Sequence, residues 1–373
     1  MEAIKEIINI GENRKTYNVE IVIQDNSDDR DLEEKISALG RSNIKYNYHA
    51  GEVSFVDNFS EAVSFATGKY LCMIGDDDGI LPTIFDAIKY MENNSVDAFI
   101  PSLNSFYVWP MKDSFIKNGD EGYLCVAYIE NGIESVSCEE SLNKVLKNGG
   151  QLYQSCDLPR LYHGIVLRSV IEKIKAKTGC YFGGLTPDIY MATALALVCE
   201  NVVKCKIPVT ISGVCTGSGS ANSATGKHTG KLEDAPHFVG HSFYQWSDKV
   251  PRIYSVETIW ADTLLHALDD FGYEHIDRFS ISALLAFCYC KYPQFKTELD
   301  VFVGEQKVSG IKIILKKIKY FDLAFIKRAF KRVTRRKNDV VKYYGVVDIE
   351  AARKIICEQM TSARISVFAD ENN

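Results

Sequence analysis

The sequence lacks the features that would place it in a membrane, outside the cell or around a zinc ion. No apolar run reaches the roughly 18 residues that a membrane span needs, and residues 1–10 alternate charged with apolar side chains and hold no signal-peptide core. The 11 cysteines are odd in number and include no CxxC pair, only Cys288-x-Cys290. These absences argue against a zinc site and favour buried thiols in a reducing compartment, so we expect a cytoplasmic protein.

The chain also lacks an overall excess of basic charge. Its formal net charge is -6 over 373 residues, so we do not expect the whole chain to bind polyanions, and we predict no nucleic-acid partner. The charge is uneven, however, because residues 312–337 hold eleven Lys and Arg against the single Asp322. With 46% hydrophobic residues, the chain can build one large domain with an appendage, or two domains.

Short β-rich runs alternate with helical patterns in the first hundred residues. The predicted strands are Val19–Ile23, Ile44–Tyr48, Tyr70–Ile74 and Asp97–Ile100. Such alternation predicts an α/β fold with a mostly parallel, Rossmann-like sheet flanked by helices. Further on, Pro187–Val198 predicts a helix, and the pattern is helical from Val256 onward.

The apolar run Tyr70–Ile74 leads through Gly75 directly into Asp76, Asp77 and Asp78. Three like charges at the end of a buried strand repel one another unless a cation lies among them. Mg²⁺ and Mn²⁺ prefer carboxylate oxygen and bind substrate phosphates beside one or two Asp. Since α/β proteins bind ligands at the carboxyl ends of their strands, we predict a metal–phosphate site here.

Several segments, in their order and spacing, resemble family 2 glycosyltransferases of the GT-A fold. The early ones are VEIVIQDNSDD (19–29), the segment 58–69 ending in Ala-Thr-Gly-Lys, and GDDDGILP (75–82). The later ones, HGIVLRSVIEKI, YFGGLTPDIY and VTISG, are similar to the bacterial surface-polysaccharide branch.

The resemblance covers roughly residues 1–230 and implies a GT-A domain there. Residues 1–100 would form the nucleotide-sugar-binding half and residues 101–230 the acceptor-binding half. Residues 231–373 would then form a helical C-terminal region.

The resemblance also implies roles for individual residues. Four would contact the nucleotide sugar: Asp25, Asn26, Asp76 and Asp77. Three would bind Mn²⁺ or Mg²⁺ at the donor diphosphate: Asp76, Asp78 and His228. Asp188, in Thr-Pro-Asp at the start of a predicted helix, matches the general base.

The activity so implied is a metal-dependent, inverting transfer of a sugar from a nucleotide-diphosphate donor, most often a UDP-sugar. The acceptor would be a glycan or a lipid-linked glycan in cell-surface polysaccharide synthesis. Such a transfer needs charge neutralisation on the leaving diphosphate, a base at the acceptor hydroxyl, and both substrates held together.

One departure from the family concerns the beginning of the sequence. Family members open with a strand similar to V-S-I-I-I-P-T-Y-N before the helix that corresponds to Ile4–Ile10. Here Met1 lies inside or just before that helix, so by this comparison the usual first strand is lacking. We expect its loss to expose backbone groups and an apolar edge beside Val19–Ile23.

The candidate site residues also have simpler, structural interpretations. Asp76–Asp78 could form a solvated turn, and Asp25 and Asp188 could each cap a helix. His228 could be a solvated loop histidine, and His163 could either be a hydrogen-bonded core residue or line the acceptor cleft.

Two other functions also remain open. The chain could be a non-catalytic scaffold with a GT-A fold. Alternatively, Asp76-x-Asp78-Gly79-Ile80-Leu81 resembles the D-x-D-G-T-L motif of haloacid dehalogenase-type phosphatases, although Ile80 replaces the hydroxyl residue and no later G-D-x-x-x-D follows.

The basic segment 311–337 carries two apolar stripes at helical spacing. The first is Ile311, Ile314, Leu315 and Ile318, and the second is Leu323, Ile326, Phe330 and Val333. A basic amphipathic helix suits an anionic membrane surface, which predicts a peripheral position on the inner face of the plasma membrane. The alternative is a solvated helical face packed on the body of the protein.

Overall fold

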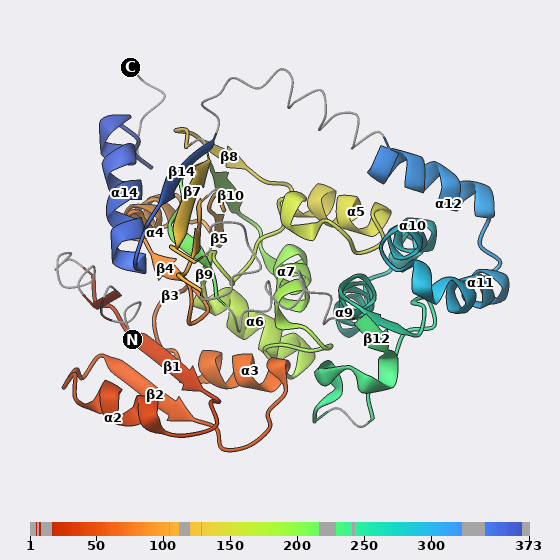
Figure 1. Ribbon diagram of the computed structural model, residues 1–373, viewed down its shortest axis with the longest axis horizontal. Coiled ribbons are helices and arrows are strands. Elements are labelled where there is room, and N and C mark those ends of the chain that lie inside the picture. Colours follow the sequence, from red (N-terminus) through yellow and green to blue (C-terminus); the bar gives the residue numbers. More distant parts are fainter. Residues whose placement is uncertain are drawn as a thin grey trace.

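In the computed structural model, β-sheets occupy one side of the molecule and a group of helices the other (Figure 1). The structure describes residues 5, 7, 8, 17–103, 105–111, 120–127, 129–215, 229–240, 243–322 and 340–367. Within these ranges, no helix combines the length and apolar character that crossing a membrane requires.

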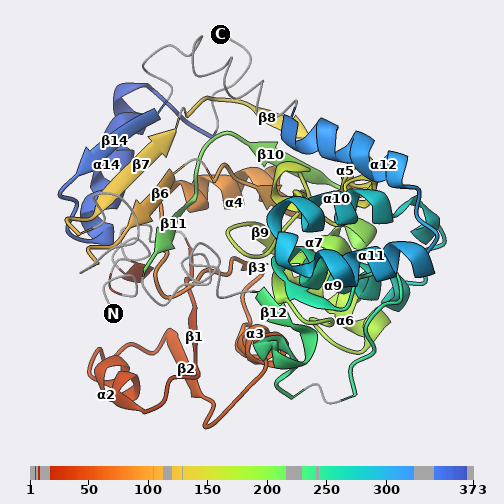
Figure 2. The same ribbon diagram turned by 45° about the vertical axis from the view of Figure 1, so that its right-hand side comes forward.

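The N-terminal strands form a small sheet of their own. β1 (Ile21–Asp25) runs parallel to β2 (Ile44–Tyr48), with Ile21 opposite Ile44 and Asp25 opposite Tyr48. Two helices accompany them: α2 (Asp31–Ser37) and α3 (Phe55–Phe65). Among the described residues these two strands pair only with each other, and Figures 1 and 2 both draw them apart from the larger sheets.

Two five-stranded sheets make up the body of the α/β part. One has the order β3-β9-β5-β10-β8 and the other β14-β7-β6-β11-β4. Their strands are β3 (Tyr70–Leu71), β4 (Gly79–Ile80), β5 (Ala98–Ile100), β6 (Ser105–Val108), β7 (Tyr123–Ala127), β8 (Ile133–Ser135), β9 (Ile165–Leu167), β10 (Val202–Cys205), β11 (Thr210–Val214) and β14 (Val340–Tyr344). The helices that accompany them are α4 (Thr83–Asn93), α6 (Arg168–Thr178) and α7 (Pro187–Val198).

The predicted α/β class with helix-flanked sheets is confirmed, but the sheets are mixed where we expected mostly parallel ones. Within the two larger sheets of the described chain, only β5–β10 and β6–β11 are parallel. β9 enters between β3 and β5 and runs antiparallel to both. Periodicity along the chain cannot reveal such an insertion, because it depends on which strands meet in space.

Helices far along the chain build a second core. It involves α5 (Cys138–Lys147), α9 (Val256–Asp270), α10 (Ile281–Lys291), α11 (Lys296–Glu305) and α12 (Gly310–Lys317). α9 begins with a capping box, in which the side chains of Ser255 and Thr258 each bond to the other's backbone N–H. The short hairpin of β12 (Thr229–Lys231) and β13 (Ile253–Ser255) precedes α9. Figure 2 shows these helices gathered on one side of the molecule.

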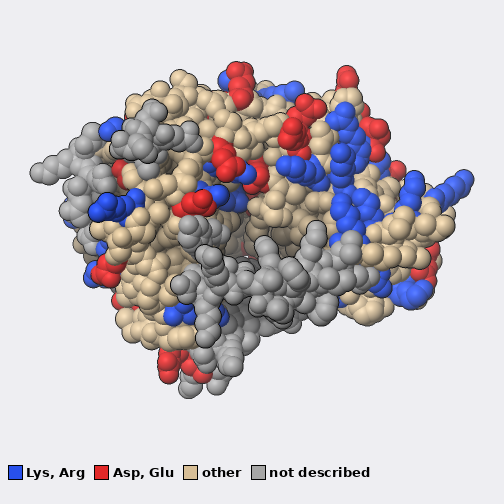
Figure 3. All heavy atoms as spheres, turned by 90° about the horizontal axis from the view of Figure 1, so that it is seen from above, with Lys and Arg blue, Asp and Glu red and all other residues tan. Residues whose placement is uncertain are grey.

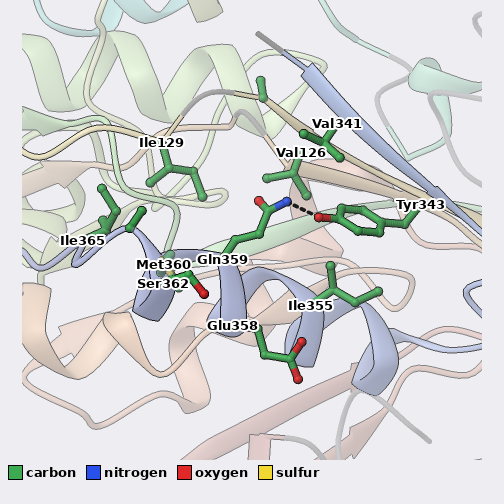
Figure 4. A pocket seen from close by; sticks show the side chains of 12 residues that line it. Val126, Ile129, Val341, Tyr343, Ile355, Glu358, Gln359, Met360, Ser362 and Ile365 are labelled. Atoms are coloured by element: carbon green, nitrogen blue, oxygen red, sulfur yellow. Dashed lines mark hydrogen bonds between the residues drawn. The ribbon is translucent and has the colours of Figure 1, made fainter. Parts of the chain in front are cut away.

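The end of the described chain returns to the first core. β14 pairs antiparallel with β7, and α14 (Ile349–Ser362) contributes Ile349 and Ile356 to the core under the second sheet. A mostly apolar pocket of about 600 Å³ lies between α14, β7 and β14, where the Gln359 amide donates to the Tyr343 hydroxyl (Figure 4). The predicted domain boundary at residue 230 stays a prediction, and residues 340–367 pack against the N-terminal part.

Candidate active site

A tight turn carries the acidic cluster. β3 is followed by an isolated bridge between Met73 and Tyr162, and the chain then turns through Asp76–Asp78 into β4. Gly213 of β11 packs against this turn, where an added Cβ atom would lie 1.8 Å from the Asp77 carbonyl oxygen. Only glycine allows so close an approach, so the sequence VTISG contributes to the site through its backbone.

Asp78 points into the protein and is 1% exposed. Its Oδ2 accepts hydrogen bonds from the Gly75 N–H at 2.7 Å and the Tyr162 hydroxyl at 2.8 Å, and its Oδ1 accepts from the Gly213 N–H at 2.6 Å. The Nε2 atom of His163 lies 3.4 Å from Oδ2. The structure therefore gives Asp78 a different setting from the predicted metal ligand, because protein donors already surround its carboxylate.

Asp76 and Asp77 are placed differently. Asp76 is exposed, whereas Asp77 is 9% exposed and its Oδ2 is buried without a hydrogen-bond partner among the described residues. Burial, followed by the charges of Asp78 and Asp76, raises the pKa of Asp77 to about 6. A buried carboxylate oxygen that lacks a donor is the group that a hard cation would satisfy.

These two carboxylates fit a divalent ion that takes its other ligands from substrate and water. In the described part of the chain, no three His, Cys, Asp or Glu side chains converge in a way that could hold a metal. Mg²⁺ is commonly bound by only one or two carboxylates together with substrate phosphates, so a pair is a sufficient protein contribution. The predicted ligand His228 lies outside the described residues.

Asp188 occupies the second position of α7, after the N-cap residue Thr186 and Pro187. It is therefore not the N-cap that the plainer interpretation assumed. Its carboxylate is half-buried and accepts from the Thr186 hydroxyl and the Tyr153 hydroxyl, each at 2.5 Å. Burial and the neighbouring Asp188 charge raise the pKa of Tyr153 well above its usual value, so this phenol stays a donor that orients the carboxylate.

Asp25 ends β1 and is 6% exposed. Its carboxylate accepts from the Ser27 N–H at 2.9 Å, from the Ser27 hydroxyl at 2.5 Å and from the Tyr46 hydroxyl at 2.5 Å. Burial raises its pKa, but these hydrogen bonds outweigh burial and hold the pKa below its usual value. Asp25 does not cap α2, whose N-cap is Arg30, and the next residue, Asn26, is exposed.

The segment that precedes β9 contacts both Asp78, through Tyr162, and Asp188, through Tyr153. His163 is 4% exposed, and its Nδ1 lies 2.9 Å from the Thr210 hydroxyl, as expected of a hydrogen-bonded core histidine. Arg160 is an electrostatic neighbour of both His163 and Tyr153. No sequence pattern pointed to Tyr153, Arg160 or Tyr162, because each contacts a partner that is distant along the chain.

Residues 2–113 match the model of the family described as glycosyl transferase family 2. This match includes Asp25 and the acidic turn, and it confirms the predicted resemblance. No curated protein matches the chain.

Solved structures of S. aureus TarS show a distant likeness. TarS 1-349 in complex with UDP-GlcNAc is 13% identical over 92% of this chain and 83% of that chain, with a TM-score of 0.44. TarS 1-349 in complex with UDP is 14% identical over 97% and 88%, with a TM-score of 0.43. A likeness this weak does not define a ligand for this protein.

Proposed function

Because residues 2–113 match the model of glycosyl transferase family 2, we propose that this protein is a metal-dependent, inverting glycosyltransferase. It would move a sugar from a nucleotide-diphosphate donor to the hydroxyl of a glycan or lipid-linked acceptor. The observation that carries the metal dependence is the buried Oδ2 of Asp77, which has no hydrogen-bond partner in the part of the chain that the structure describes and follows the exposed Asp76 in the turn after β3.

In this proposal the acidic turn binds the metal and α7 supplies the general base. Asp76 and Asp77 would hold Mn²⁺ or Mg²⁺, which when bound neutralises charge on the donor diphosphate. Asp188 would accept the proton of the acceptor hydroxyl, and Tyr153 and Thr186 keep its carboxylate in one orientation. Asp78 would have a structural role, because its carboxylate accepts hydrogen bonds from Gly75, Gly213 and Tyr162 and so holds the turn in place.

The remaining donor contacts follow the resemblance. Asp25 and Asn26 would meet the nucleotide base at the end of β1, with UDP as the first nucleotide to test. The hydrogen bonds from Ser27 and Tyr46 would hold the Asp25 carboxylate in one orientation for this role. They also occupy much of its capacity to accept hydrogen bonds. Residues 101–230 would receive the acceptor, and a metal contact from His228 stays a prediction.

A thermal-shift screen tests the donor site. UDP, GDP, CDP and dTDP are each added with and without Mn²⁺ to the wild type and to Asp77→Asn. Asp269→Asn serves as a control, since Asp269 is an exposed carboxylate on α9. We expect one nucleotide to stabilise the wild type and the control only when metal is present, and this stabilisation to be lost in Asp77→Asn. If no nucleotide shifts the wild type, the scaffold function replaces the enzyme.

We also propose that α12 rests on an anionic membrane surface, as a peripheral enzyme acting on lipid-linked acceptors would. Ile311, Ile314 and Leu315 are 72%, 57% and 61% exposed. Ile313, outside the predicted stripe, is instead the residue that packs against the helical core.

The charge around this stripe supports the same partner. Lys312, Lys317 and Lys319 are exposed beside it, and Figure 3 shows Lys and Arg gathered on the side where Figure 1 draws α12. Exposed aliphatic side chains flanked by lysines are the pattern of an interfacial helix.

Vesicle sedimentation tests this surface. The wild type should sediment with vesicles containing phosphatidylglycerol and much less with pure phosphatidylcholine vesicles. The double variant Ile311→Ser/Leu315→Ser should lose the difference, whereas Val301→Ser, an exposed position on α11, should keep it. Equal sedimentation of the wild type and the double variant would contradict the membrane role.

A further inference from the structure

Arg160 is a half-buried cationic residue that forms no ion pair with the acidic side chains of the described residues. Its Nη2 donates to the Pro101 carbonyl oxygen at 2.9 Å, while its Nε is buried and without a hydrogen-bond partner. Among the described residues, no carboxylate oxygen lies within 4.0 Å of its guanidinium. Burial lowers the pKa of Arg160, although the guanidinium stays charged at neutral pH.

The nearby carboxylates already have partners. Asp157, three residues earlier, accepts from the Lys204 ammonium at 3.1 Å. Asp188 accepts from Tyr153 and Thr186, and Asp78 from three protein donors. A side-chain rearrangement that paired Arg160 with one of these acids would therefore break existing hydrogen bonds.

The position of Arg160 is fixed by its surroundings. An added Cβ atom on Gly164 would lie 1.9 Å from the Arg160 carbonyl oxygen, so the chain folds back tightly on itself here. The His163 N–H donates to the Met73 carbonyl oxygen at 2.9 Å, which ties this segment to the strand that leads into the acidic turn. Arg160 is also an electrostatic neighbour of His163, which lies beside Asp78, and of Tyr153, which donates to Asp188.

A half-buried guanidinium that has no ion-pair partner among the described residues is a group that an anionic ligand would neutralise. Arginine presents its N–H groups in a planar fork that matches phosphate oxygens. We propose that Arg160 binds the diphosphate of the donor, between the acidic turn and Asp188. This inference rests on the proposed function, because the diphosphate is the anion which that function brings to the site.

Arg160 would then assist the departure of the nucleotide. In the transfer, the acceptor oxygen forms a bond to the anomeric carbon, and the bond from that carbon to the β-phosphate oxygen breaks. The electron pair of the broken bond stays on that phosphate oxygen, and the acceptor proton passes to Asp188. A fixed cation at the β-phosphate stabilises the charge that appears there, and it needs no reorganisation during the step.

Calorimetric titration of the full-length protein in the presence of Mn²⁺ tests this role. The probes are UDP, UMP and inorganic pyrophosphate, and the last of these does not depend on the base. The variants are Arg160→Met and Arg160→Lys, with Arg168→Met as a control, since Arg168 pairs with Glu172 on the surface of α6.

We expect Arg160→Met to weaken the binding of UDP and pyrophosphate at least tenfold. The binding of UMP should weaken less than twofold, because UMP lacks the β-phosphate. The affinity of Arg160→Lys for UDP and pyrophosphate should lie between those of the wild type and Arg160→Met. This variant also tests the role of Arg160 if Arg160→Met does not fold. Arg168→Met should bind like the wild type.

Two negative results have different meanings. If the wild type binds UDP or pyrophosphate and both Arg160 variants bind them equally well, the role of Arg160 is overturned while the proposed function stands. If the wild type binds neither pyrophosphate nor UDP, GDP, CDP or dTDP, the proposed function fails and this inference fails with it.

Discussion

Replacing Asp78 with alanine should destabilise the whole protein, which is more than the loss of a metal ligand would do. The carboxylate is 1% exposed and accepts hydrogen bonds from Gly75, Gly213 and Tyr162. In Asp78→Ala these three donors would stay buried without an acceptor. Two of them are backbone N–H groups that cannot turn toward another partner.

The expected size of this effect follows from the number of donors. Each buried donor left unsatisfied costs about 1–3 kcal/mol, so three together should lower the free energy of unfolding by at least ~3 kcal/mol. That is a large part of the roughly 5–15 kcal/mol that stabilises a typical protein. Asp76→Ala is the matched control, because Asp76 is exposed and its removal should change stability by less than ~0.5 kcal/mol.

Urea unfolding in metal-free buffer, followed by circular dichroism, measures both variants against the wild type. We expect a clearly lower midpoint for Asp78→Ala and an unchanged one for Asp76→Ala. Suppose instead that Asp78→Ala unfolds like the wild type and loses only Mn²⁺-dependent nucleotide binding. Asp78 would then be the metal ligand that the sequence predicts, and our interpretation of its hydrogen bonds would be wrong.

Three further predictions concern catalysis, pH and packing. Asp188→Asn should lower turnover by about 10²–10⁴-fold, the usual contribution of a general base, and leave nucleotide affinity unchanged in a titration. Burial raises the pKa of Asp262 to about 6, so its protonated form favours folding below pH ~4 and this contribution is lost as the pH rises through 6. The stability of the wild type relative to Asp262→Asn should therefore fall by up to ~2 kcal/mol between pH 4 and 7, and a constant difference would show that Asp262 does not titrate in this range. Gly213→Ala should lower the free energy of unfolding in urea by about 1–3 kcal/mol, because its Cβ would lie 1.8 Å from the Asp77 carbonyl oxygen; a near-neutral result would mean that β11 can move away from the turn.

Local patterns in the sequence were sufficient for many elements. The strand Ile44–Tyr48 and the helix Pro187–Val198 have the predicted bounds, because apolar runs and a proline at the first helical position are local signals. The strand predicted at Tyr70–Ile74 is shorter in the structure and covers only Tyr70–Leu71. Its last residues lack a continuous partner, since Met73 makes only the single bridge to Tyr162.

The sequence alone was enough to predict the α/β class, the resemblance to family 2 glycosyltransferases and three carboxylates after an apolar run. Tertiary structure alone decided what each carboxylate does, because Gly213 and Tyr162, which enclose Asp78, lie 135 and 84 residues away along the chain. It also decided that one oxygen of Asp77 lacks a hydrogen-bond partner among the described residues and that the apolar stripe of α12 faces outward. Periodicity records which side chains share a face, whereas burial, charge and hydrogen bonding depend on the segments that the fold brings against that face.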